Sequence, residues 1–165
     1  MKTALWLAIV AIFFVALPWS LRQPEGSFEF HGHALQWLGL WLMLNGLGLA
    51  AWCVTLFRVI GKGTPLPFAP PQRFVVAGPY RVVRNPMALG VLLLLGGQAA
   101  LYESTAVFLY SAQVAAALIL YVRLVEEPKL VKRFGTPYEA YRRHVPGWVP
   151  RLPKPFSAAR PPKSR

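Results

Sequence analysis

The residues best suited to chemistry lie in two blocks of this sequence, separated by two apolar segments. The first block is GPYRVVRNP, from Gly78 to Pro86, and the second is EEPKLVKRFGTPYEAYRRHVP, which begins at Glu126. Together they hold arginines, an amide, paired carboxylates and phenols, namely Arg81, Arg84, Asn85, Glu126, Glu127, Tyr138 and Tyr141. If the carboxylates end an apolar helix, they oppose its dipole. They then need a compensating cation, which is either an arginine or a positively charged ligand.

The composition indicates a membrane protein. Of the 165 residues, 55% are hydrophobic and only 15% are charged, against roughly 25% charged in an average soluble domain. The net charge of +12 comes from 18 Lys and Arg against six Glu, with no Asp. These basic residues flank apolar runs, so we expect the lipid bilayer and its anionic headgroups as partners and no nucleic acid. The lone Cys53 and the lack of any Cys/His cluster predict a packing residue and no metal.

Four apolar segments are close to the length of a membrane-spanning helix, which is about 20 residues. They cover residues 3–21, 34–57, 87–102 and 105–125. We therefore predict an all-α, polytopic membrane protein with four transmembrane helices, in which the third and fourth form a tight hairpin. The first segment is also compatible with a signal peptide. We favour a retained helix, because Pro18 and Trp19 occupy the place of a cleavage site.

Basic residues set the expected orientation, because cytoplasmic loops are enriched in Lys and Arg. Five of them lie between Arg58 and Arg84 without any acid, and many more follow the fourth segment. We therefore expect both termini and the candidate site on the cytoplasmic side, as in a bacterial inner-membrane protein. The loop between the second and third helices is rich in proline, with Pro65, Pro67, Pro70, Pro71, Pro79 and Pro86.

Short helices are expected after the fourth span. The first covers about Pro128 to Phe134 and ends at Gly135. The second begins at Thr136-Pro137-Tyr138-Glu139, which has the pattern of a capping box. We take residues 1–151 as a single membrane-embedded domain and residues 152–165 as a basic tail that we expect to be disordered.

The hairpin should bring the two blocks together. The third helix is predicted to begin at Asn85-Pro86 and the fourth to return to the same side at Glu126-Glu127. Each residue also has a purely structural interpretation. Asn85 is a good helix cap, the arginines are ordinary topology signals, and the glutamates can simply end a span.

The order of these blocks around a helical hairpin resembles the isoprenylcysteine carboxyl methyltransferase family, whose members are membrane methyltransferases that use S-adenosylmethionine. The resemblance covers residues 61–150, and phospholipid methyltransferases resemble the chain more distantly. It implies a methyltransferase whose cofactor contacts Gly78, Pro79, Tyr80, Asn85, Pro86, Glu126, Glu127, Tyr138 and Tyr141. Arg84, Asn85 and Glu127 are the implied catalytic residues. The chain departs from many members in having Asn85 in place of histidine and Ala88 in place of tyrosine.

The charges of this methyl donor agree with such a site. Glutamates and aromatic faces suit its sulfonium and amine, and arginine suits its carboxylate. We expect an apolar or lipid-like acceptor that offers a carboxylate, a thiol or an amine. Two alternatives stay open, namely an NADPH-dependent membrane reductase of the steroid-reductase type and a non-catalytic membrane scaffold.

The predicted topology can be tested with reporter fusions. Fusions at Gly63 and after Arg151 should report the cytoplasm, because basic loops stay on that side. A fusion near Gly26 should report the opposite side. Periplasmic activity of the Gly63 fusion would contradict the orientation.

Overall fold

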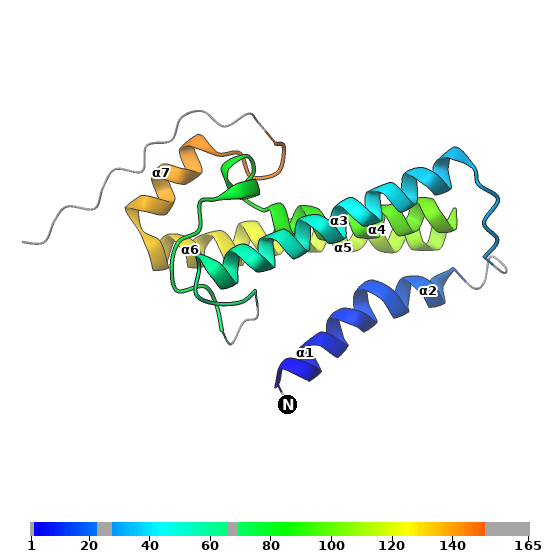
Figure 1. The fold of residues 1–165 in the computed structure, drawn as a ribbon, viewed down its shortest axis with the longest axis horizontal. Helices are drawn as coiled ribbons and strands as arrows, with labels where there is room; N and C mark the ends of the chain where they lie inside the picture. The colour runs from blue at the N-terminus through cyan, green and yellow to red at the C-terminus, as the bar shows by residue number, and fades with distance from the viewer. Residues whose placement is uncertain (1, 23–27, 66–68, 151–165) are drawn as a thin grey trace, which may run out of the picture.

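All secondary structure in the described part of the chain is helical, as predicted. The computed structural model describes residues 2–22, 28–65 and 69–150. Three long helices, α3, α4 and α5, lie side by side, and the short helices α6 and α7 gather at one end of them (Figure 1). In chain order the elements are α1 (Lys2–Ala11), a π-helical turn (Ile12–Ala16), α2 (Leu17–Leu21), α3 (Ala34–Val59), a 3-10 turn (Gly78–Arg81), α4 (Pro86–Tyr102), α5 (Thr105–Tyr121), a second π-helical turn (Val122–Glu126), α6 (Glu127–Phe134) and α7 (Thr136–His144). The predicted tail, 152–165, lies outside the described residues.

Helices α3 and α4 approach until their backbones touch. A Cβ atom at Gly39 would lie 2.7 Å from the carbonyl oxygen of Gly97, and one at Gly46 would lie 2.6 Å from that of Gly90. Gly39 and Gly46 are seven residues apart on α3, and Gly90 and Gly97 are seven residues apart on α4. Both contacts therefore fall on one face of each helix. Small residues at such an interface allow the close van der Waals contact that drives helix association in lipid. These four glycines therefore fix the register of α4 against α3.

Among the described residues, two helices are long and apolar enough to cross a bilayer. These are Ala34–Val59, with 26 residues, and the continuous helix Thr105–Phe134, with 30 residues. Shorter apolar helices cover Ala8–Leu21 and Pro86–Tyr102. The predicted starts of the second and third apolar helices agree with the structure to within one residue.

The predicted end of the fourth helix near Val125 is wrong. Helix α5 continues through the π-helical turn Val122–Glu126 into α6 without a break. Pro128 has no N–H for the carbonyl of Leu124, and its ring would crowd that carbonyl in a regular α-helix. The wider turn, in which the Glu127 N–H donates to the Val122 carbonyl, accommodates the proline. Glu126 and Glu127 therefore lie within a helix and do not oppose the dipole at a helix C-terminus, as the sequence had suggested.

The first apolar helix has the same arrangement. Its π-helical turn ends at Ala16, two residues before Pro18. Two carbonyl oxygens of this turn accept hydrogen bonds from side chains of other helices. Gln98 Nε2 donates to the Phe14 carbonyl at 2.8 Å, and the Tyr110 hydroxyl donates to the Phe13 carbonyl at 2.7 Å. Side chains of α4 and α5 thus hold the first helix through its backbone.

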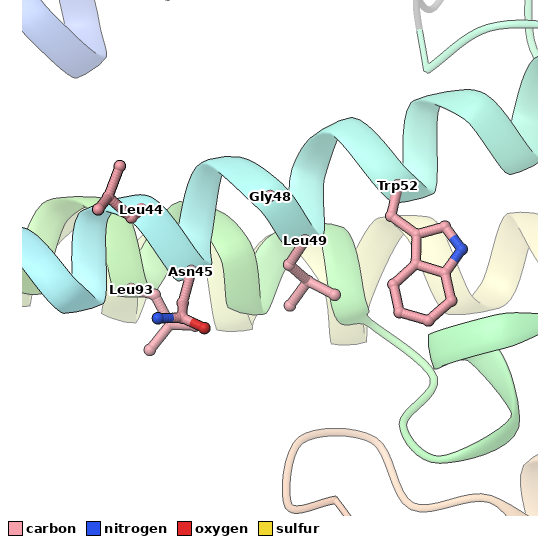
Figure 2. Close-up of a pocket in the computed structure, with 6 residues that line it drawn as sticks. All are labelled: Leu44, Asn45, Gly48, Leu49, Trp52 and Leu93. Carbon is pink, nitrogen blue, oxygen red and sulfur yellow. The ribbon is translucent and has the colours of Figure 1, made fainter.

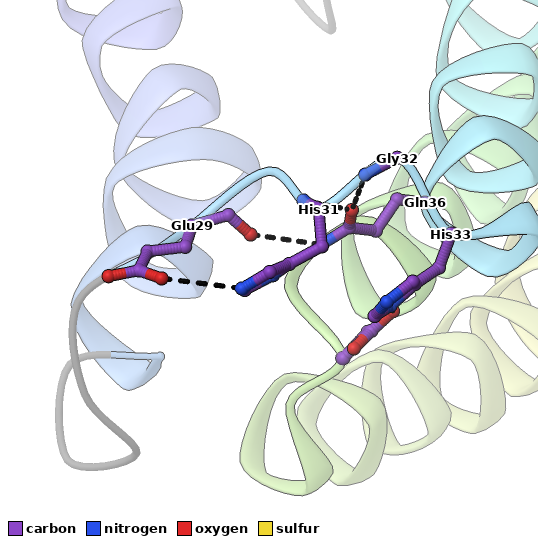
Figure 3. Close-up of polar contacts among 6 residues, drawn as sticks. Glu29, His31, Gly32, His33 and Gln36 are labelled. Carbon is purple, nitrogen blue, oxygen red and sulfur yellow. Dashed lines mark hydrogen bonds and ion pairs between the residues drawn. The ribbon is translucent and has the colours of Figure 1, made fainter.

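The connection into α3 is organised by one buried glutamine. Gln36 accepts hydrogen bonds from the backbone N–H groups of His31 and Gly32, at 2.9 and 3.0 Å, and donates to the Glu29 carbonyl at 3.1 Å (Figure 3). Its side chain is thereby satisfied although Gln36 is only 3% exposed. These bonds fold residues 29–32 back over the first turn of α3.

The importance of the close α3–α4 contact can be tested with two alanine substitutions. Gly46→Ala should destabilise the protein by about 1–3 kcal/mol, because the added Cβ meets backbone atoms of α4. Gly48→Ala is the matched control, because it lies on the same helix with open space around it. It should be neutral or stabilising by up to about 1 kcal/mol through helix propensity. Thermal unfolding in detergent measures both, and equal melting temperatures would contradict the interface.

Candidate functional site

The two sequence blocks meet at the end of the bundle where α3 ends and α4 begins. The chain between α3 and α4 and the segment after α7 lie there beside α6 and α7 (Figure 1). Buried aromatic residues form the centre of this region. Tyr138 and Tyr141 of α7 are each 2% exposed. Both rings pack against Phe74, which also packs against Phe134. Val145 belongs to the same buried cluster as both tyrosines.

An ion pair joins the two blocks. Arg84 Nη1 donates to Glu127 Oε1 at 2.6 Å, and each side chain is only 14% exposed. Arg84 also lies close enough to Tyr138 to interact electrostatically with its hydroxyl group. These contacts tie the start of α4 to α6 and α7. The cation that compensates Glu127 is therefore Arg84.

Arg84 keeps one donor unused. Its Nε is buried and has no hydrogen-bond partner among the described residues. An unpaired buried donor is costly and uncommon in proteins. This N–H is therefore suited to an anionic group of a ligand.

Asn85 does not cap α4 with its side chain. It occupies the N-cap position without forming a side-chain capping bond, and its Nδ2 donates instead to the Gly147 carbonyl at 3.1 Å. A backbone hydrogen bond joins the same two segments, because the Arg84 N–H donates to the Pro146 carbonyl at 2.8 Å. Pro86, which follows, is buried as the first residue of α4. Asn85 therefore holds the segment after α7 against the start of α4.

Tyr80 and Tyr141 connect α7 to the core. The Tyr141 hydroxyl donates to the Tyr80 carbonyl at 2.6 Å. The Tyr80 ring is buried beside Cys53 of α3, in the same hydrophobic cluster. Burial raises the pKa of both phenols, so they remain neutral donors at physiological pH. Cys53 is a packing residue, as predicted.

The turn that carries Gly78 and Pro79 packs directly on α3. Gly78 has a φ of +54°, which favours glycine, and a Cβ there would lie 3.1 Å from side-chain atoms of Trp52 and Leu56. Pro79 follows as an early residue of the 3-10 turn and fixes its backbone. This turn brings Tyr80 into contact with α3.

The paired glutamates have different surroundings. Glu127 is bound to Arg84, whereas Glu126 is exposed and forms no ion pair or hydrogen bond with the described residues. Glu126 is nevertheless close enough to Tyr80 and Tyr138 to affect them electrostatically. Glu126 is thus the carboxylate of the pair that remains available for a ligand.

The predicted capping box is not formed. Gly135, with a φ of +57°, is the N-cap of α7, and Thr136 is already the first helical residue. Gly135 ends α6 in the same conformation, so one residue serves both helices. The sharp turn at this glycine therefore replaces the side-chain cap that the sequence suggested.

Comparison of the sequence with known proteins agrees with the resemblance to membrane methyltransferases. The sequence profile of the phospholipid methyltransferase family matches residues 34–137. The chain is also similar to methanethiol S-methyltransferase 2 of Bradyrhizobium diazoefficiens, with 42% identity over 73 residues. That match covers 44% of this chain and 27% of the relative, so the chain spans about a quarter of the relative's length. No solved structure matches the chain.

A double-mutant cycle tests the ion pair. Glu127→Gln should cost about 3–5 kcal/mol, because it leaves the Arg84 charge uncompensated in a largely buried position. With Arg84→Gln and the double variant, the cycle should give a coupling of about 1.5–3 kcal/mol. The exposed His33–Glu103 pair is the control, with side chains 61% and 37% exposed, and solvent screening should leave its coupling below about 1 kcal/mol. Equilibrium unfolding measures both cycles, and equal couplings would contradict the special role of Arg84.

Proposed function

The chain belongs to the phospholipid methyltransferase family, and we propose that it transfers a methyl group from S-adenosylmethionine to an apolar, lipid-like acceptor at the cytoplasmic face of the membrane. One observation carries this proposal. Arg84 of the first sequence block and Glu127 of the second form an ion pair at one end of the helical bundle, with 2.6 Å between Nη1 and Oε1. The family match includes both residues.

The residues at this site fit the donor. Its carboxylate suits the unused Nε–H of Arg84, and its cationic groups suit the Glu126 carboxylate, which has no ion-pair partner among the described residues. When bound, S-adenosylmethionine supplies a methyl group that is activated by a sulfonium. Gly78, Pro79, Tyr80, Pro86, Tyr138 and Tyr141 are proposed to shape this site, with the two α7 tyrosines supporting it from the core.

The contribution of the protein is mainly positioning. Methyl transfer is a direct displacement, which requires alignment of the acceptor atom with the methyl carbon and its leaving sulfur. Arg84, held by Glu127, is a rigid binding group, and Asn85 fixes the segment after α7 beside it. We assign Arg84, Asn85 and Glu127 to the binding and alignment of the reactants.

A thiol is the acceptor group that we favour among carboxylate, thiol and amine. The relative from Bradyrhizobium is named for methyl transfer to the sulfur of methanethiol. The acceptor sulfur would form its bond to the methyl carbon as the bond from that carbon to the donor sulfur breaks. The thiol proton would leave to water or to Glu126. A thiolate is a strong nucleophile, so the reaction needs little further activation by the protein.

Four spans with a cytoplasmic site complete the proposal. Helix α4 has 17 residues, or about 26 Å of length, which nearly spans a hydrocarbon core of about 30 Å without tilt. The exposed basic residues of α6 and α7, Lys132, Arg133, Arg142 and Arg143, would then contact anionic headgroups. The donor, which is water-soluble, would reach the site from the cytoplasm.

Binding and transfer assays test the function. Purified protein in nanodiscs should bind S-adenosylmethionine and not NADPH, and membranes given labelled methyl donor should yield label in the lipid or volatile fraction. Binding of NADPH alone would favour a reductase, and binding of neither molecule would favour a scaffold.

The role of Glu126 gives a sharper prediction. Glu126→Gln should weaken donor binding roughly 10- to 100-fold, because a charge-assisted hydrogen bond is lost. Its melting temperature should stay unchanged, because Glu126 is exposed and forms no ion pair with the described residues. Glu139→Gln, an exposed glutamate of α7, is the matched control and should bind normally. Parental affinity in Glu126→Gln would remove Glu126 from the site.

A further inference from the structure

A groove runs along the exposed face of α3, beside α4. It has a volume of about 490 Å³ and is lined by Leu44, Asn45, Gly48, Leu49, Trp52 and Leu93 (Figure 2). All but Leu93 belong to α3. Gly48 leaves its middle open, because a Cβ there would have no atom within 4 Å. The groove lies along the surface of α3, an apolar helix that is long enough to cross the bilayer. In a membrane, the groove would therefore be open to lipid.

One polar side chain faces this groove. Asn45 is exposed, and its Nδ2 donates to the Trp41 carbonyl at 2.7 Å, on its own helix. Its Oδ1 accepts no hydrogen bond from the described residues. An amide that faces hydrocarbon is costly, and polar groups at such depth mark binding sites in membrane proteins. The free acceptor therefore calls for a ligand with an O–H or N–H donor.

The groove leads to the candidate site. Trp52 at its end packs on the turn at Gly78, where a Cβ would lie 3.1 Å from the indole ring. Leu49 in its wall also packs against the buried cluster of Cys53, Val75 and Tyr80. The seven residues from Asn45 to Trp52 span about 10 Å along the helix axis. A molecule in the groove can thus have one end at the Gly78 turn and a polar group about 10 Å deeper in the membrane.

We infer that this groove binds the apolar chain of the methyl acceptor, and that Asn45 accepts a hydrogen bond from a donor group on that chain. The inference rests on the proposed function and assigns the acceptor to a class, namely long-chain thiols with a hydroxyl or amide N–H remote from the sulfur. A bulk lipid chain has no donor for Asn45, and a molecule as small as methanethiol would leave most of the groove unfilled.

Substitutions of two glycines that have open space around them test the groove without disturbing packing. Gly48→Leu places a side chain in the groove, whereas Gly96→Leu adds the same side chain on α4, outside the residues that line it. Both positions are open, with no atom within 4 Å of an added Cβ. Equilibrium binding of radiolabelled mercaptoundecanol to purified protein in detergent should weaken at least tenfold in Gly48→Leu and remain parental in Gly96→Leu. Parental binding in Gly48→Leu would overturn the proposal.

A matched pair of chains tests the role of Asn45. Mercaptoundecanol and dodecanethiol differ only in the terminal hydroxyl, which replaces a methyl group. The parent should bind mercaptoundecanol roughly 2- to 10-fold more tightly, as one hydrogen bond allows. Asn45→Leu should remove this preference while keeping dodecanethiol affinity. An unchanged preference in Asn45→Leu would overturn the assignment of the polar anchor.

Turnover separates this inference from the proposed function. Methyl transfer to methanethiol should be equal in the parent, Gly48→Leu and Gly96→Leu, whereas transfer to mercaptoundecanol should fall only in Gly48→Leu. If mercaptoundecanol binds in the groove but no thiol is methylated, the groove inference would stand and the proposed thiol methyltransferase activity would be refuted. Transfer to mercaptoundecanol at the parental rate in Gly48→Leu would refute the groove and leave the methyltransferase intact.

Discussion

The contact between the α3 and α4 backbones at four glycines is the constraint on which the rest of the structure depends. Gly39 meets Gly97 and Gly46 meets Gly90, so α4 can take only one register along α3. That register places the start of α4, with Arg84 and Asn85, beside the last turns of α3. The groove and the candidate site both lie along the resulting α3–α4 pair, because Trp52 of α3 contacts the turn that precedes α4.

Local signals in the sequence were enough to predict most of the helices. The apolar runs located α3 and α4 closely, and Asn85-Pro86 marked the start of α4. Basic and acidic residues in two blocks also identified the partners of the Arg84–Glu127 ion pair, although not the pair itself. These features depend on neighbours in the sequence or on a hairpin with a short connection, and such features follow from periodicity and charge.

Other features depend on contacts that the sequence does not reveal. Pro128 suggested the start of a new helix, whereas a π-helical turn carries one helix past it, as another does at Pro18. Pro18 lies within a continuous apolar run, whereas Pro128 follows two glutamates, and in both cases only the packing decides between a break and a wider turn. The Gly147 partner of Asn85 is 62 residues away, and the groove exists only where α3 and α4 pack together.

The most direct measurement for the whole account is photochemical cross-linking of methyl-labelled S-adenosylmethionine to the purified protein, followed by identification of the labelled peptides. The ion pair between Arg84 and Glu127 joins the sequence blocks that form the candidate site. We expect label in residues 78–86 and 126–141, and none when excess unlabelled donor is present. Label confined to α1 or α5, or label that excess donor fails to reduce, would contradict a methyl-donor site at this end of the bundle.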